Sequence, residues 1–315
     1  MKILYVTSSC LGDAILGSGP LHALLKKRTE DISVTVACGA RTAALFKDVP
    51  GLKEIIPFEG PRGLRRWWNL WKKCSGTQWD IIVDLRGSIL SYLLKTKRRY
   101  VWRSTKRQGH RVEVIAKVLG FDPVPSPYVW IRQERLTKAK QWAKQAGGPI
   151  FGFSAVAGWP LKEWPMEQFG KLISALLKEY PTAKIILFGS PTEQEKLKKL
   201  WALVPQEFHW PVQGNSHLLD TAACISQCFL FIGNDSGLMH LSSALNVPTV
   251  DLFGPSNEKN YGPWGAKSLA IRSVETVEEL MKKKNMGKNL MGGLSLDHVI
   301  SSVQKFAKEQ KGAVK

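Results

Sequence analysis

Residues 229–240 read Phe-Leu-Phe-Ile-Gly-Asn-Asp-Ser-Gly-Leu-Met-His, an apolar run that ends in small and polar residues and then continues with helical spacing. The run predicts a buried strand, and the recurrence of Leu238, Leu241 and Leu245 predicts a helix directly after the turn. Small residues let a ligand approach the backbone, and a helix N-terminus offers N–H groups to an anion. The segment therefore indicates an α/β fold with a site for an anionic group such as a diphosphate.

Strand and helix patterns alternate on both sides of this segment. Before and after it in the second half, strands are predicted at 150–154, 184–189 and 249–253, with helices at 166–179 and after Ser190. In the first half, strands are predicted at 2–6, 33–37 and 80–85, with a helical stretch at 14–28. Such alternation is typical of parallel strands that are joined by crossover helices.

A break at Ala146-Gly147-Gly148-Pro149 separates the two halves, and a new first strand follows it at residue 150. A chain of 315 residues with 44% apolar residues can form two cores. We therefore expect two doubly wound domains, 1–148 and 149–315, and an amphipathic terminal helix at about 295–307. Ligands of such sheets bind outside the carboxyl ends of the strands, so a cleft between facing domains is the expected site.

The net charge of +19 is concentrated in the first half of the chain. Residues 1–148 carry 27 Lys and Arg against 11 Asp and Glu, whereas residues 149–315 carry 18 against 15. A positive field raises the local concentration of anionic partners, which include nucleic acid, membrane surfaces and acidic substrates. The two halves are therefore expected to bind different ligands.

The cysteines and the N-terminus bear on location. Five cysteines without a CxxC pair indicate a reducing compartment, and the helical spacing of Cys224 and Cys228 suits core thiols better than a metal site. The N-terminus lacks the pattern of a signal peptide, and no apolar run reaches the roughly 20 residues that span a bilayer. We expect a cytoplasmic protein whose membrane contact, if any, is peripheral.

Two further loops follow predicted strands and carry residues suited to chemistry. The turn 7–13 has free backbone N–H groups but no GxGxxG spacing, and its Asp13 could either cap a helix or act on a substrate. The loop 157–165 places Lys162 among tryptophans and prolines, where it could neutralise a departing phosphate or remain a plain surface lysine. His240 suits packing and ligand contact about equally.

Metal dependence is not expected. The sequence contains no Asp-x-Asp, no HExxH and no Cys/His cluster with zinc spacing. The negative charge of a bound diphosphate would then be neutralised by Lys162 and helix dipoles, without a metal or another cofactor.

Together these segments resemble the bacterial glycosyltransferases of family 9, which include the ADP-heptose:lipopolysaccharide heptosyltransferases. The matching elements occur in family order over most of the chain, at 8–13, 84–88, 159–165, 234–240 and 248–255. The resemblance implies a GT-B fold of two facing Rossmann-like domains with a C-terminal helix. It also implies that the first domain holds the acceptor and the second holds the nucleotide-sugar, and that transfer inverts the configuration at the anomeric carbon.

The resemblance also implies roles for single residues. Asp13 matches the general base, which takes a proton from the acceptor hydroxyl. The matching donor-binding positions are Lys162, Asp235, Ser236, Gly237, Leu238, His240 and, near the nucleoside, Glu193. The loop 154–158 departs from some members, which place a histidine and paired threonines there, so the expected sugar is not restricted to heptose and includes related sugars.

Basic segments of the first half are the expected acceptor side. In the family this region receives a phosphate-bearing sugar-acid lipid core, which guanidinium groups bind well. The expected acceptor-binding residues are Ser9, Gly12, Arg62, Arg65, Arg66, Arg98, Arg99, Arg103 and Arg107. The segment 62–73 also places Trp67, Trp68 and Trp71 at helical spacing, which fits either an anionic bilayer interface, such as the inner-membrane surface, or packing on the core.

Three other functions remain open at this point. A nucleotide-sugar epimerase on a similar fold would convert its substrate without an acceptor. A non-enzymatic nucleic-acid-binding protein would explain the sequence pI near 9.8 but not the loops of the second half. An inactive scaffold is disfavoured because both Asp13 and Lys162 are present. We expect a nucleotide-sugar and an anionic glycolipid as partners, and no nucleic acid.

Overall fold

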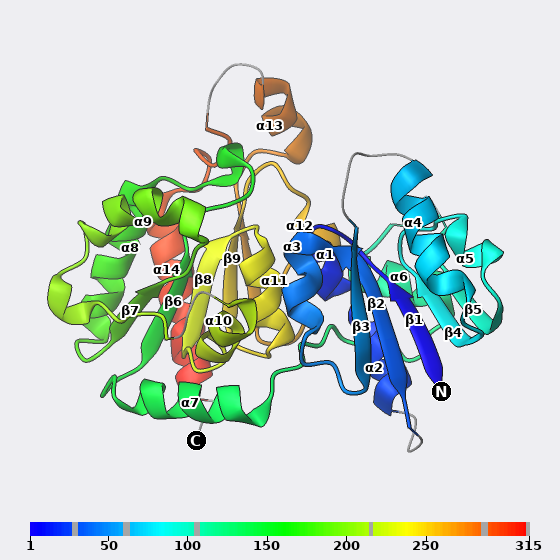
Figure 1. Cartoon of the computed structure of the whole chain (residues 1–315). Helices are drawn as coiled ribbons and strands as arrows, with labels where there is room; N and C mark the ends of the chain where they lie inside the picture. The colour runs from blue at the N-terminus through cyan, green and yellow to red at the C-terminus, as the bar shows by residue number, and fades with distance from the viewer. Residues whose placement is uncertain (27–30, 59–63, 104–107, 214–216, 285–288, 313–315) are drawn as a thin grey trace. The chain divides into compact units, whose positions relative to one another are not determined.

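The structure is a computed structural model that describes the chain except residues 27–30, 59–63, 104–107, 214–216, 285–288 and 313–315. The chain divides into two compact units, Met1–Arg132 and Gln133–Lys315, each with its own five-stranded sheet (Figure 1). All strand pairs within both sheets are parallel. The α/β class and the double-sheet architecture predicted from the sequence are therefore confirmed.

The boundary between the units differs from the one drawn at 148/149. Helix α7 (Gln133–Lys144) groups with the second unit, because it packs against α10 (Leu218–Ile225). Arg135 of α7 pairs with Asp220 of α10, and Trp142 Nε1 donates to the carbonyl oxygen of Pro211 at 3.1 Å. The glycine-rich break thus follows a helix that is already part of the second unit.

The first sheet has the strand order β3-β2-β1-β4-β5. Its strands are β1 (Lys2–Val6), β2 (Ser33–Gly39), β3 (Leu52–Phe58), β4 (Trp79–Asp84) and β5 (Thr96–Val101). Its helices are α1 (Leu11–Leu16), α2 (Gly19–Lys26), α3 (Ala40–Ala43), α4 (Leu64–Ser75), α5 (Leu90–Leu93) and α6 (Arg111–Leu119). Val6 at the end of the central strand lies opposite both Ala37 and Asp84, so β1 and β4 end at one level and β2 continues two residues beyond it.

The helical stretch predicted at 14–28 is two helices, α1 and α2, within the described residues. The chain turns at Gly17 and Ser18, where the Ser18 hydroxyl donates to the carbonyl oxygen of Ile15 at 2.6 Å. Pro20 lies in the first turn of α2, where its missing N–H costs no helical hydrogen bond. A side chain at Gly17 would meet Leu85 at 2.5 Å, so only glycine fits this turn without a shift.

The two faces of the first sheet are covered by different helices. On one face, Leu4 and Val6 share a buried cluster with Leu70 of α4 and Leu90 of α5, and Trp67 and Trp71 pack against this cluster. On the other face, the ring of Tyr5 packs against Phe46. Two of the three tryptophans of the predicted ridge therefore serve the core.

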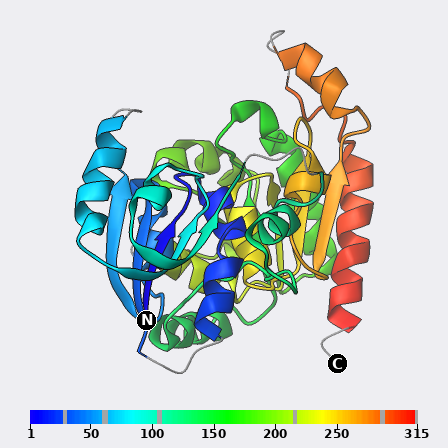
Figure 2. The ribbon, with the colours of Figure 1, turned by 90° about the vertical axis from the view of Figure 1, so that its right-hand side faces the viewer.

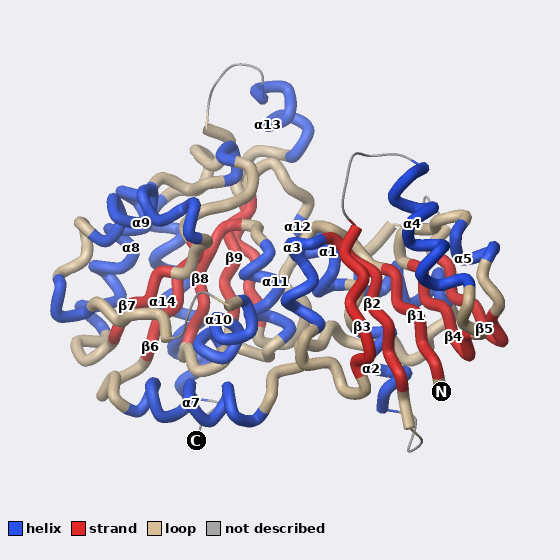
Figure 3. The backbone as a smooth tube through the Cα atoms, in the orientation of Figure 1, coloured by secondary structure: helices blue, strands red, loops and turns tan. Residues whose placement is uncertain are grey.

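The second sheet has the strand order β10-β9-β8-β6-β7. Its strands are β6 (Ile150–Ser154), β7 (Lys184–Leu187), β8 (Leu230–Asn234), β9 (Thr249–Phe253) and β10 (Ser268–Arg272). Besides α7 and α10, its helices are α8 (Met166–Glu179), α9 (Gln194–Trp201), α11 (Gly237–Ala244), α12 (Glu258–Tyr261), α13 (Val277–Lys283) and α14 (Leu296–Gly312). In Figure 3 the helices lie on both sides of these strands.

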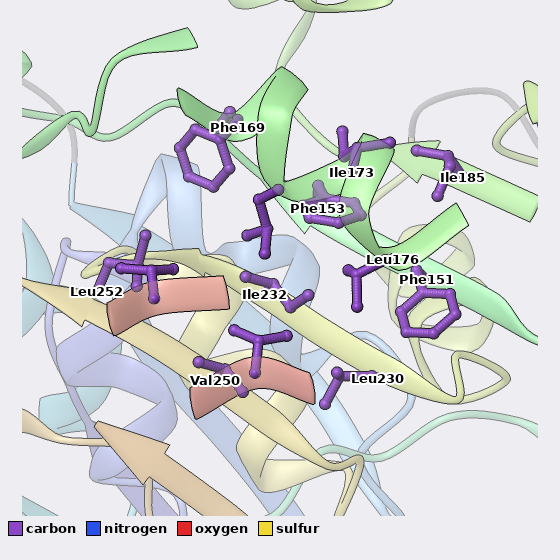
Figure 4. Close-up of a cluster of buried hydrophobic side chains, with 14 of the residues drawn as sticks. Phe151, Phe153, Phe169, Ile173, Leu176, Ile185, Leu230, Ile232, Val250 and Leu252 are labelled. Atoms are coloured by element: carbon purple, nitrogen blue, oxygen red, sulfur yellow. The ribbon is translucent and has the colours of Figure 1, made fainter. Parts of the chain in front are cut away.

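The core of the second unit lies between the sheet and α8 (Figure 4). Phe153, Ile232 and Leu252 come from three neighbouring strands and meet Phe169 and Ile173 of α8. Each such fully buried side chain stabilises the fold by about 1.5–3 kcal/mol. The alternation of side chains along a strand then sends the residues between them to the opposite face, under α11.

The predicted C-terminal helix is present as α14, which runs alongside β10 and packs against α8 (Figure 2). Its apolar side chains Val299, Val303 and Phe306 recur at helical spacing and are buried in the same core. In the described part of the chain, no helix has both the length and the apolar character needed to cross a bilayer.

Candidate functional site

The loops that follow β6, β7 and β8 emerge along one edge of the second sheet. Ser154 pairs with Gly233, and Phe153 pairs with Leu187, so the three strands end at nearly the same level. Lys162 lies in the loop after β6, in the short 3-10 turn Pro160–Lys162 (η2), and Asp235 directly follows β8. The fold therefore brings together two segments that are more than 70 residues apart in the sequence.

Lys162 and Asp235 form an ion pair at this edge. Lys162 Nζ lies 2.6 Å from Asp235 Oδ2, and the two side chains are 26% and 10% exposed. Partial burial makes such a charged pair stronger than a surface pair, since less water screens it. The Lys162 ammonium group is thus held at the edge of the sheet by the Asp235 carboxylate.

The side chain of Asn234 ties the two loops together. Its Oδ1 accepts from the backbone N–H of Trp164 at 3.0 Å, and its Nδ2 donates to the carbonyl oxygen of Ala155 at 2.8 Å. Trp164 is buried, and its Nε1 donates to the carbonyl oxygen of Leu294. No separate role was predicted for Asn234, although an amide between a buried strand and a turn is a recognisable signal.

Glu163 stabilises the same loop from the other side. Its Oε1 accepts from the backbone N–H of Ala157 at 3.2 Å and lies 2.9 Å from Lys196 Nζ. Its carbonyl oxygen accepts from the side chain of Asn289 at 2.9 Å. The loop that carries Lys162 is therefore fixed at three points besides the ion pair.

Helix α11 begins at the same edge, directly after Asp235. Ser236 is its N-cap, and the Ser236 hydroxyl makes no capping bond and has no hydrogen-bond partner among the described residues. Gly237 and Leu238 form the first turn, whose N–H groups precede the first intrahelical bonds. His240 lies one turn further on and is buried. The arrangement can bind an anion next to the Lys162 cation.

A buried carboxyl group, Asp251, lies beneath this turn. Val250 and Leu252 point into the core, so Asp251 lies on the opposite face of β9, where Thr249 contacts Ser242 of α11. Neither carboxyl oxygen has a well-aligned hydrogen-bond donor among the described residues. Burial above all, and then the charge of Asp235, hold the pKa of Asp251 well above its ordinary value.

Replacement of Asp251 by asparagine is expected to stabilise the protein by about 1–3 kcal/mol near pH 8, because it removes a fully buried carboxyl group whose charged form is costly to bury. The raised pKa means that Asp251 keeps a proton in the folded state that the unfolded chain releases. Stability is then fully present below the unfolded pKa and is lost as pH rises through the folded pKa, so the gain should grow with pH. Urea unfolding of both proteins between about pH 5 and about pH 8 measures this.

Asp80 is the matched control for that experiment. Its pKa is lowered, chiefly by the hydrogen bond from Lys97, so its stabilising contribution is present above the unfolded pKa and is lost only as pH falls through the folded pKa. Asp80→Asn should show no gain that grows with pH. A constant gain for Asp251→Asn at every pH would contradict the account of Asp251.

Glu193 lies at the same edge of the sheet, after β7. Its Oε2 accepts from the backbone N–H of Ser190 at 2.7 Å and from the Ser190 hydroxyl at 2.8 Å, which forms a capping box around the 3-10 turn Pro191–Glu193 (η3). In the structure this carboxylate therefore has a local partner. A ligand that contacts Glu193 would therefore share the Glu193 carboxylate with Ser190.

In the first unit, Asp13 lies in the first turn of α1, at the carboxyl edge of the sheet. The Ser8 hydroxyl, which is 3.4 Å from Asp13 Oδ2, also accepts from the backbone N–H of Cys10 at 3.1 Å. Asp13 is half-buried and does not occupy the N-cap position, which belongs to Cys10. The carboxylate is thus held near a helix N-terminus, where negative charge is favourable.

The loop before Asp13 is pressed against the end of β2. A side chain at Gly39 would meet the Cβ atom of Ser9 at 2.4 Å, so the close approach requires glycine. The Thr42 hydroxyl donates to the carbonyl oxygens of Ser8 and Gly39, both at 2.9 Å. Ser9 and Gly12 lie in this turn, and Ser9 is exposed.

Asp84, at the end of β4, organises the neighbouring loop. Its carboxylate accepts from the backbone N–H of Arg86 at 2.8 Å, and from both the backbone N–H and the hydroxyl of Ser88 at 2.9 and 2.5 Å. Burial raises the pKa of Asp84, and these hydrogen bonds oppose the rise. Asp84 is therefore a structural residue of the edge that holds Asp13.

The predicted acceptor arginines do not all lie at this edge. Arg98 and Arg99 are within β5, and Arg99 donates to the carbonyl oxygens of Ser91 and Leu94, whereas Arg103 follows the end of the strand and is exposed. Arg62 and Arg107 lie outside the described residues. Arg65 and Arg66 are in α4, but their side chains lie outside the described part of the structure.

Residues 110–292 match the family model described as glycosyltransferase family 9 (heptosyltransferase). The chain is 25% identical to lipopolysaccharide heptosyltransferase 2 of Salmonella typhimurium over 319 aligned residues, which cover 90% of this chain and 91% of that protein. The matched family region contains Lys162, Asp235 and Asp251 but not Asp13.

Two solved structures share the fold over nearly the whole chain. A family 9 glycosyl transferase from Veillonella parvula aligns with a TM-score of 0.79 and 21% identity, covering 98% of this chain and 97% of its own. ADP-heptose lps heptosyltransferase II of E. coli aligns with a TM-score of 0.75 and 22% identity, covering 99% and 100%. The family model spans more than half of the sequence, and these structures show the same architecture.

Proposed function

The chain belongs to glycosyltransferase family 9, and we propose that it transfers heptose or a related sugar from a nucleotide-diphosphate donor to an anionic acceptor. The donor is ADP-heptose, and the acceptor is a lipopolysaccharide core or a similar glycolipid. The names of the relatives support both assignments. The observation that carries the proposal is the Lys162–Asp235 pair beside the N-terminus of α11, in the region that the family model matches.

The second unit binds the donor in this proposal. Lys162 leaves its resting partner Asp235 in part and neutralises the diphosphate, while the N–H groups of Gly237 and Leu238 and the hydroxyl of Ser236 donate to phosphate oxygens. His240 lies behind this turn, and Glu193 contacts the nucleoside at the neighbouring loop. The fixed loops keep these groups in place before the donor arrives, which lowers the entropy cost of binding.

The first unit binds the acceptor and supplies the base. An acceptor hydroxyl oxygen attacks the anomeric carbon, Asp13 takes its proton, and the bond from that carbon to the diphosphate oxygen breaks. The nucleoside diphosphate leaves with the bonding electrons, and the anomeric configuration inverts in this single displacement. Ser9 and Gly12 precede Asp13 in the sequence, Arg103 follows the end of β5 in the same sheet, and Arg98 adds positive charge.

The reaction uses no metal ion in this proposal. The sequence has no Asp-x-Asp, and Lys162 with the dipole of α11 supplies the positive charge that a divalent ion would otherwise provide. The protein acts at the cytoplasmic face of the inner membrane, where a lipid-borne acceptor is exposed to it. Contact with that membrane is peripheral.

ADP is expected to raise the melting temperature of the protein more than UDP, GDP or CMP do, because a ligand that binds only the native state stabilises it. The rise should be about the same with magnesium and with EDTA. Thermal unfolding followed by intrinsic tryptophan fluorescence measures both effects. At 100 times its Kd, the nucleotide should contribute about 2.7 kcal/mol at 25 °C.

Other results would favour other functions. A shift that requires magnesium would contradict the metal-independent site. No shift with any nucleotide, together with salt-sensitive binding of single-stranded nucleic acid, would favour the nucleic-acid reading. Conversion of a nucleotide-sugar in the absence of acceptor would favour an epimerase.

A further inference from the structure

Four large apolar side chains are exposed close together on the first unit. Trp68 on α4 is 54% exposed, and Ile89, Tyr92 and Leu93 around α5 are 71%, 50% and 62% exposed. The helices α4 and α5 lie side by side in Figure 1 and contact each other. Leu70 of α4 and Leu90 of α5 belong to one buried cluster. We call these four residues, with the basic residues Lys72, Lys73 and Arg99 beside them, the α4–α5 surface.

The helical spacing of α4 places Trp68 on the outer side of the helix. Leu70 and Cys74 point inward, and Trp71 packs partly on the core, so Trp68 and Lys72 share the outer side at i and i+4. The ring of Trp68 stacks on the ring of Trp71, with the two centroids 4.8 Å apart. Lys72 Nζ lies 5.6 Å from the centre of the Trp68 ring. Trp68 is therefore held outward by packing rather than being loosely exposed.

Basic residues border the apolar side chains. The guanidinium of Arg99 lies 5.5 Å from the ring centre of Tyr92, and its donations to Ser91 and Leu94 fix it there. Between residues 64 and 103 the sequence has ten Lys and Arg against two Asp. One of these is the buried Asp84, and the other, Asp80, pairs with Lys97. Exposed negative charge is nearly absent from this segment.

The surface borders the edge of the sheet that carries Asp13. Ile89 directly follows Ser88, which bonds to Asp84 at the end of β4, and Asp84 lies opposite Val6, the last residue before the Asp13 turn. A binding partner that covers Ile89 and Leu93 therefore lies close to the sheet edge that carries Asp13 in the same unit.

We propose that the α4–α5 surface docks the protein on an anionic lipid bilayer. Aromatic and aliphatic side chains with a basic border fit the headgroup boundary, where apolar groups enter the bilayer and lysines remain with anionic headgroups. Nucleic acid offers no partner to Ile89 and Leu93, and a second copy would bring two basic surfaces together. The purpose of docking, delivery of a lipid-borne acceptor to Asp13, rests on the proposed function.

Flotation of the full chain with vesicles tests the proposal. Vesicles of equal parts phosphatidylglycerol and phosphatidylcholine should bind the wild type, and the binding should weaken with salt, whereas pure phosphatidylcholine vesicles should bind it much less. Ile89→Ser/Leu93→Ser and Lys72→Glu/Lys73→Glu should each lower the partition coefficient about tenfold or more. Melting temperatures show whether both variants are folded, and either folded variant suffices for the test.

Matched controls lie on the second unit. Val274→Ser changes an apolar residue that is 88% exposed, and Lys198→Glu/Lys199→Glu reverses an adjacent lysine pair on α9; neither should alter vesicle binding. The proposal is overturned if both surface variants bind like the wild type or if the controls lose as much. It is also overturned if the same variants instead lose RNA binding or concentration-dependent self-association without any change on vesicles.

Sugar transfer to a water-soluble acceptor separates this proposal from the proposed function. The surface variants should transfer to such an acceptor at the wild-type rate, because docking is not needed there. Absence of transfer in every protein, with vesicle binding still lost in the variants, would leave docking in place and remove the proposed function.

Discussion

Asp13→Asn is expected to lower kcat for sugar transfer by about 10²- to 10⁴-fold, the usual contribution of a general base. In the wild type the Ser8 hydroxyl lies 3.4 Å from Asp13 Oδ2. The asparagine keeps an oxygen that can accept this hydrogen bond, but it cannot take the proton from the hydroxyl of the sugar acceptor. Donor affinity should change little, because Asp13 belongs to the first unit. Steady-state kinetics with saturating donor, together with calorimetric titration of ADP, measure both quantities.

A structural role for Asp13 would give a different pattern. Loss of its charge near the start of α1 would cost about 0.3–1 kcal/mol of stability and would leave turnover largely intact. Ser8→Ala is the matched control, because it removes the hydroxyl beside Asp13 and leaves the carboxylate in place; we expect a loss below about tenfold. Unimpaired turnover in Asp13→Asn would remove Asp13 as the base.

Lys162→Ala is expected to lower kcat/KM by about 10²- to 10³-fold and to weaken ADP binding, because it removes the positive charge that neutralises the leaving diphosphate in the proposed mechanism. Lys198→Ala is the control, since Lys198 lies on neighbouring α9, pairs with Glu195 of the same helix and should leave donor affinity unchanged. Kinetics under varied donor concentration and ADP titration give the two values.

The ion pair with Asp235 complicates that result, because Lys162→Ala also leaves a nearly buried carboxylate without its partner. The double variant Lys162→Ala/Asp235→Asn removes this problem. If Lys162 acts on the diphosphate, the double variant stays impaired, whereas recovery to near wild-type activity would show that only the unpaired Asp235 had caused the loss.

The interior strands of both sheets were predictable from the sequence, but three edge strands were not. β1, β4, β8 and β9 are buried apolar runs, and their observed bounds fall within one residue of the prediction at each end. β3 contains Pro57, β5 begins Thr-Lys-Arg-Arg, and β10 is short and half-exposed; all three lie at sheet edges. An edge tolerates proline and charge because one side of the strand needs no partner, so the apolar signal is lost there.

The candidate site shows a similar division. Lys162, Asp235 and Ser236 could be predicted to share one sheet edge because each follows a buried strand, and the register of β6 and β8 places them there. Asp251 was overlooked because the run Thr-Val-Asp-Leu-Phe reads as an apolar strand, and only the packing of α11 shows that its carboxyl group is enclosed. The exposed Ile89 and Leu93 were overlooked because outward direction is set by tertiary packing on a very short helix.

The proposed reaction moves a sugar from a nucleotide donor to an acceptor, with inversion at the anomeric carbon. The most direct test incubates the protein with ADP-heptose and a water-soluble lipopolysaccharide core fragment, without added metal, and follows both products by mass spectrometry and proton NMR. The account predicts an acceptor that gains one sugar for each ADP released, linked with the anomeric configuration opposite to that of the donor. Release of ADP without a glycosylated acceptor, or a product that retains the donor configuration, would contradict it.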